Sequence, residues 1–144
     1  MNDLKVVTVE EANRLLPFLT ERIHGLQKKR EEILSHEVEI DALELVTENK
    51  GEEGSPAVHK KVEEYHQIVN RFYAVIDEIH ETGCLLKDLD LGLVDFYSLY
   101  NGRVVYLCWR LGEPEVAHWH EIGRGYACRQ PIIFDENPRR ESSG

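Results

Sequence analysis

The sequence lacks the run of about 18 apolar residues that a membrane-spanning helix requires. Its first residues also lack the basic start and apolar core of a secretory signal. Basic residues are too few for a nucleic-acid-binding surface, because 17 lysines and arginines are outnumbered by 27 acidic residues. With a net charge of −10, we expect an acidic, cytoplasmic protein that binds neither membrane nor nucleic acid.

Common catalytic motifs are missing as well. The chain has no glycine-rich phosphate loop, no Gly-x-Ser-x-Gly nucleophile turn and no His-Glu-x-x-His zinc motif. Its three cysteines are an odd number at irregular spacing, so they do not form a disulfide framework. This cysteine content favours a reducing compartment and leaves the reaction or ligand open.

A long first helix is expected near the N-terminus. Thr8-Val9-Glu10-Glu11 has the pattern of a capping box, in which the threonine hydroxyl and the last glutamate satisfy each other's backbone amides. Apolar residues then recur at helical spacing, which predicts a helix to about Glu37, with a continuation through Leu45 as the alternative. Pro17 lies inside this pattern, and we expect it to kink the helix rather than break it.

A second helix should follow a loop at residues 49–54. Ser55 and Pro56 are typical of an N-cap and a first helical position. Apolar residues recur every three or four positions as far as Ile79, which indicates a coiled-coil-like seam, and Gly83 ends the pattern. The two helices should therefore form an antiparallel hairpin over residues 9–82.

The periodicity then changes to two, which is typical of strands. Leu91–Phe96 and Arg103–Arg110 are expected strands, joined by a tight hairpin turn at Asn101-Gly102. A second turn leads to a partner strand at Val116–Ile122. The fold class is therefore α+β, with the helical hairpin followed by a small, mainly antiparallel sheet within residues 84–134.

We expect a single domain over residues 1–134 and a disordered tail at 135–144. The helical hairpin and the sheet should meet at four large side chains: Tyr106, Leu107, Trp109 and Trp119. The helical seam is long relative to the sheet, so part of it should remain uncovered. Uncovered apolar seam favours self-association, most simply as a homodimer.

The sequence resembles a small bacterial family that is catalogued only as a domain of unknown function. The motifs that carry the resemblance are EEANRLLPFL, LLKDLDLGLVDF and VVYLCWRLGEPEVAHWHEIGRGYACRQP. The resemblance implies a cytoplasmic protein with this order of helices and sheet, and it brings no established activity. The family's Trp-His-Glu matches residues 119–121, whereas its Gly-Arg-x-Pro is matched imperfectly, because Cys128 replaces the glycine. His118 is the second departure from the family pattern.

Polar residues gather around the last strand and the segment after it. A polar cleft could be formed by Glu113, Glu115, His120, Glu121, Arg124 and Arg129. Carboxylates beside a histidine suit acid–base chemistry, and an arginine can bind a carboxylate or phosphate through two hydrogen bonds. The ligand-binding residues we expect are Glu113, His118, His120, Glu121 and Arg129. A charged hairpin surface with internal ion pairs is the alternative.

A metal site is a second interpretation of the same region. His118 and His120 are two residues apart, so on a strand they share a face, and a hairpin brings Cys108 near them. Together with Cys128 they would make a zinc site of mixed cysteine and histidine ligands. The alternative is that the cysteines are small core residues and that no cofactor binds.

Two classes of function therefore remain open. One is an interaction, scaffold or small-ligand-binding module that self-associates through its helices. The other is a small enzyme or metal-binding protein that uses the region of His118, His120 and Arg129. Whether His120 and Arg129 share one pocket distinguishes the two.

Overall fold

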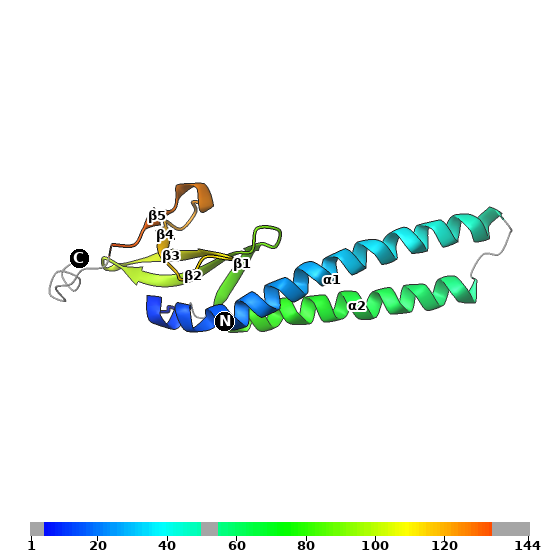
Figure 1. Ribbon diagram of the computed structural model, residues 1–144, viewed down its shortest axis with the longest axis horizontal. Helices are drawn as coiled ribbons and strands as arrows, with labels where there is room; N and C mark the ends of the chain where they lie inside the picture. The colour runs from blue at the N-terminus through cyan, green and yellow to red at the C-terminus, as the bar shows by residue number, and fades with distance from the viewer. Residues whose placement is uncertain (1–4, 50–54, 134–144) are drawn as a thin grey trace. The chain divides into compact units, whose positions relative to one another are not determined.

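The computed structural model describes residues 5–49 and 55–133. Two long helices come first, α1 at Val9–Asn49 and α2 at Pro56–Glu81 (Figure 1). The remaining elements, in chain order, are β1 (Cys84–Asp88), β2 (Leu93–Tyr100), β3 (Arg103–Arg110), β4 (His118–His120), the 3-10 turn η1 (Tyr126–Cys128) and β5 (Gln130–Pro131). The predicted α+β order, a helical hairpin followed by a small antiparallel sheet, is confirmed. The predicted loop after Asn49 and the predicted tail at 135–144 lie outside the described residues.

The capping signals act as predicted. The Thr8 amide donates to Glu11 Oε1 over 2.9 Å, and the Glu11 amide donates to Thr8 Oγ1 over 3.1 Å. α1 continues without a break through Pro17. It runs to Asn49, beyond Glu37 and the alternative end near Leu45, because no stop signal interrupts the helical spacing of its apolar side chains in between.

The described residues fall into two compact units. One contains α1 as far as Ile23 together with the chain from Glu78 onward, and the other is His24–Asp77. The single domain stays a prediction. No helix within the described ranges is long and apolar enough to cross a membrane.

The unit His24–Asp77 consists of two antiparallel helical segments joined by polar pairs. Lys61 Nζ lies 2.8 Å from Glu39 Oε2, and the Tyr65 hydroxyl donates to Glu37 over 2.7 Å. On α1 of this unit, large apolar side chains are exposed at Leu34, Val38, Leu45 and Val46. Self-association through the helices would use such a surface, and the coiled coil and the homodimer stay predictions.

The other unit carries the sheet, whose strands lie in the order β1-β2-β3-β4-β5, each antiparallel to the next. The turn between β2 and β3 is the predicted one, with positive φ at Asn101 (53°) and Gly102 (79°). β4 is shorter than the predicted strand at Val116–Ile122. The Val116 amide explains part of this, because it donates to the Asn13 side chain on α1 over 2.7 Å instead of to a strand.

One face of the sheet is apolar. Register places Phe96, Leu107 and Trp119 side by side across β2, β3 and β4, with Trp109 next to them along β3. These side chains are buried, as are Ala12, Leu16, Leu19 and Ile23 on α1. The Ser98 hydroxyl donates to the Val7 carbonyl over 2.6 Å, which ties the approach to α1 to β2. The core of this unit therefore lies between the apolar face and the start of α1.

Tyr106 does not belong to that core, contrary to the prediction that it anchors the junction with Leu107, Trp109 and Trp119. It alternates with Leu107 along β3, so its ring lies on the opposite face of the sheet. There its hydroxyl lies 3.3 Å from the Tyr97 hydroxyl. This second face, the polar face, carries the candidate site.

Candidate functional site

Residues from three strands meet on the polar face. Asp95 on β2 is paired with Cys108 on β3, and Cys108 is paired with His118 on β4. Directly opposite residues of antiparallel strands point to the same face, and so do residues two apart on one strand. The polar face therefore carries His120 beside His118, as the strand alternation predicts for Cys108 and the two histidines.

Three of these side chains form a compact buried cluster. Only 5% of Asp95, 1% of Cys108 and 2% of His120 is exposed. One carboxylate oxygen, the thiol sulfur and one imidazole nitrogen all lie within 4.8 Å of one another. In the part of the chain that the structure describes, this is the only such group of three or more potential metal ligands.

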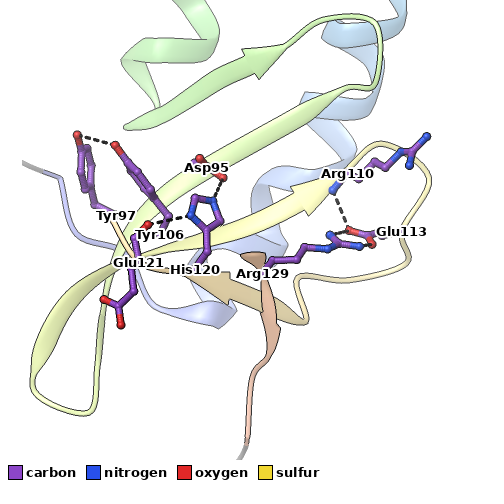
Figure 2. Close-up of polar contacts among 8 residues, drawn as sticks. All are labelled: Asp95, Tyr97, Tyr106, Arg110, Glu113, His120, Glu121 and Arg129. Atoms are coloured by element: carbon purple, nitrogen blue, oxygen red, sulfur yellow. Dashed lines mark hydrogen bonds and ion pairs between the residues drawn. The ribbon is translucent and has the colours of Figure 1, made fainter. Parts of the chain in front are cut away.

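The imidazole of His120 is held at both nitrogens (Figure 2). Nε2 lies 3.1 Å from Asp95 Oδ1, and Nδ1 lies 3.0 Å from the backbone carbonyl oxygen of Glu121. A carbonyl oxygen only accepts hydrogen bonds, so Nδ1 must carry the proton and donate it. The tautomer of a neutral His120 is thereby fixed, with the lone pair of Nε2 directed at the carboxyl group.

This arrangement does not suit a cysteine nucleophile. A cysteine–histidine pair needs an imidazole nitrogen that is free to take the thiol proton, and both nitrogens of His120 are engaged. Burial also raises the pKa of Cys108 to about 12, and the nearby Asp95 carboxylate acts in the same direction. The thiol is therefore protonated near neutral pH in the metal-free protein, unlike an activated nucleophile.

Among the carboxylates of the described residues, Asp95 is the one that is buried. Burial raises its pKa from the ordinary aspartate value, while His120 opposes the shift through its charge and its hydrogen bond. A buried carboxyl group without a partner is strongly unfavourable in free energy. Asp95 therefore depends on His120, on Cys108 or on a bound cation.

Arg129 connects the cluster to the loop between β3 and β4. Its guanidinium donates to both oxygens of Glu113, over 3.0 and 2.6 Å, and lies 4.3 Å from the centre of the Tyr126 ring. Its charge also acts on the Cys108 thiol, whose pKa it lowers against the larger effect of burial. Arg129 and His120 therefore both adjoin Cys108, but the guanidinium is already occupied by groups of the protein itself.

Glu113 organises that loop. Besides Arg129, its Oε1 accepts the backbone amide of Arg110 over 2.8 Å (Figure 2). Burial acts to raise the pKa of Glu113, but the hydrogen bonds from Arg129 and from the Arg110 backbone hold it below its usual value. Glu113 is thus an ionised structural anchor, and its role is to hold Arg129 in place.

The other residues that the sequence singles out lie elsewhere. Glu121 forms an ion pair with Arg103, and only its backbone carbonyl meets His120. Cys128 is exposed on η1, so it is not part of the buried cluster. The exposed side chains of Glu115 and Arg124 do not complete the predicted cleft.

Asp95 is the residue that the sequence interpretation misses. On β2 it alternates with Val94 and Phe96, which are both fully buried, so the period of two alone indicates a solvent-facing carboxylate. The structure instead buries Asp95 on the polar face, where a carboxylate needs a partner on a neighbouring strand. That partner depends on strand register, which the sequence does not supply.

A family model describes residues 5–132 of the chain, and its family is the uncharacterized conserved proteins DUF2203. The chain belongs to this family. The predicted resemblance to a family of unknown function is thereby confirmed. No curated protein and no solved structure matches the chain. The chemistry of this DUF2203 protein must therefore be argued from its own side chains.

One thiol of this DUF2203 protein should react quickly in the native, metal-free state. Cys128 is exposed, whereas Cys84 and Cys108 are buried, and burial raises the pKa of both. A chromogenic disulfide reagent should therefore titrate one thiol before unfolding and all three in guanidinium. Cys128→Ala should remove the fast phase. Fast reaction of two or more native thiols would contradict the buried placement of Cys108.

Proposed function

We propose that this DUF2203 protein binds a divalent transition-metal ion of the zinc class through Asp95, Cys108 and His120. The observation that carries the proposal is that their three ligand atoms, all buried, lie within 4.8 Å of one another. A carboxylate, a thiolate and an imidazole are the three ligand types that proteins use for zinc. Their softness disfavours magnesium and calcium, which prefer oxygen ligands.

The hydrogen bond at His120 Nδ1 supports this function. Metal-binding histidines usually donate their second nitrogen to a carbonyl or carboxylate, which fixes the ring and directs the other nitrogen at the ion. His120 has this arrangement with the Glu121 carbonyl, over 3.0 Å. An ion at the cluster would replace the proton between Nε2 and Asp95, and it would also displace the proton of Cys108.

Metal binding also explains why such groups are buried in a small sheet. The ligands come from the neighbouring strands β2, β3 and β4, so one ion would cross-link all three. The last two strands are short, with three residues in β4 and two in β5. An ion bound by His120 would tie the short strand β4 to β2 and β3. The proposed role is therefore a metal-stabilised binding module.

Elemental analysis tests the proposal directly. Protein expressed without a polyhistidine tag should contain about one zinc-class ion per chain, or take one up after incubation with Zn²⁺. Cys108→Ala and Asp95→Ala should lose the ion. Cys128→Ala is the matched control, because this thiol is exposed and lies outside the cluster. Wild-type protein that binds no ion, or a Cys108→Ala variant that retains it fully, would overturn the proposal.

We also infer a reducing, cytoplasmic location. All three cysteines are free. Two of them are buried, and one of those two is a proposed metal ligand that must remain a thiol until the ion binds. An oxidising compartment would place the exposed Cys128 at risk of intermolecular disulfides.

A further inference from the structure

The proposed metal site is incomplete with three ligands. Zinc in a closed site takes four protein ligands, whereas a site with three keeps a position open for water or substrate. The cluster is closed, since at most 5% of any of its three side chains is exposed. The fourth ligand should therefore come from the protein.

We propose that His118 is the fourth ligand, so that the site is a closed structural centre rather than a catalytic one; this inference rests on the proposed metal binding. His118 is the cross-strand partner of Cys108 and lies on the polar face with His120. Its Nδ1 atom is buried and has no hydrogen-bond partner among the described residues. Buried polar atoms are rarely left in this state, so each one calls for an explanation.

The unpartnered nitrogen also lowers the free-energy cost of turning the His118 ring toward the ion. His118 is not part of the 4.8 Å cluster, so its ring must turn toward the ion. Because Nδ1 makes no hydrogen bond, turning it breaks none at that atom. The gain is a coordination bond to a nitrogen that is otherwise buried without compensation.

The other neighbours of the cluster are already committed. Both oxygens of Glu113 bind Arg129. Tyr106 is next to His120, with ring centres 5.3 Å apart, but its hydroxyl donates to the Tyr97 hydroxyl over 3.3 Å. Zinc commonly binds an imidazole nitrogen, and His118 offers one that makes no hydrogen bond.

Cobalt substitution separates this inference from the proposed function. Co²⁺ bound to wild-type protein should show thiolate-to-cobalt charge transfer and the intense visible bands of four-coordinate cobalt. His118→Ala should keep the charge transfer from Cys108 but change the position and intensity of the visible bands, because water would take the place of the imidazole. Its zinc affinity, measured by competition with a chromophoric chelator, should fall by more than the roughly 10–100-fold that loss of an outer hydrogen-bonding partner causes.

Four further variants make the result decisive. His118→Asp and His118→Cys keep a ligand atom and should restore the zinc affinity, whereas His118→Gln should not. His66→Ala, on the exposed surface of α2, is the matched histidine control and should change nothing. Unchanged affinity and cobalt bands in His118→Ala would overturn the role of His118 alone. Absence of any cobalt charge transfer in wild-type protein would instead overturn the proposed function.

Discussion

Replacing Trp109 with alanine should lower the free energy of unfolding by about 3–5 kcal/mol. Trp109 is 1% exposed and is the largest of the fully buried side chains in the described chain. Its removal leaves a cavity on the apolar face that the neighbouring strands cannot close, because their backbones are fixed by the ladders on both sides of β3. The indole Nε1 also donates to the Glu113 carbonyl over 3.0 Å, and that acceptor would lose its partner.

Urea unfolding followed by circular dichroism measures this loss, because the signal does not depend on the tryptophan itself. Leu99→Ala is the control on the same sheet, since Leu99 is 63% exposed and its truncation should change stability by no more than about 0.5 kcal/mol. If Trp109→Ala unfolded within 1 kcal/mol of the wild type, roughly the effect of an average substitution, Trp109 would not be the centre of this core.

The helices and turns of this protein are predictable from the sequence because their signals are local. The capping box at Thr8–Glu11 and the Asn101-Gly102 turn each lie within four neighbouring residues, and the structure has both. Element ends that depend on distant partners are not predictable in this way. Val116 leaves its expected strand because its amide meets Asn13, more than 100 residues earlier in the chain.

The candidate site likewise has a part that local sequence patterns predict and a part that depends on distant partners. Strand alternation predicts that His118 and His120 share a face, because that relation needs only a period of two, and a hairpin is expected to bring Cys108 near them. Asp95 completes the cluster through the pairing of β2 with β3, which no local pattern in the sequence specifies. Strand register therefore determines which of the candidate ligands lie together in the folded protein.

Arg129 illustrates a second limit of sequence reasoning. Its residue type suits recognition of an external carboxylate or phosphate, and the sequence interpretation places it in a binding site. The structure has it bound to Glu113 through two hydrogen bonds, with the pair largely buried. Residue type indicates which anion an arginine can bind, but only the fold determines whether that anion is internal.

Replacing His120 with alanine should cost about 3–5 kcal/mol of stability even in chelator-treated, metal-free protein. The change leaves the Asp95 carboxyl group, 5% exposed, without the imidazole that lies 3.1 Å away. Removing one partner of a buried pair is costly because the other remains desolvated and loses its strongest interaction. Lys61→Ala is the control, since Lys61 and Glu39 are 37% and 50% exposed and breaking such a solvent-screened pair should change stability far less.

A double-mutant cycle shows whether Asp95 and His120 act as a pair. Once His120 is alanine, Asp95→Ala should cost less than it does in the wild type, because it then removes a buried carboxyl group that has already lost its partner. The expected coupling energy is about 0.5–3 kcal/mol in metal-free protein. If the two losses of unfolding free energy simply add, the two side chains are independent. That result would contradict a preformed pair of ligands. Because the measurement uses metal-free protein, it tests the built geometry of the site separately from its occupancy.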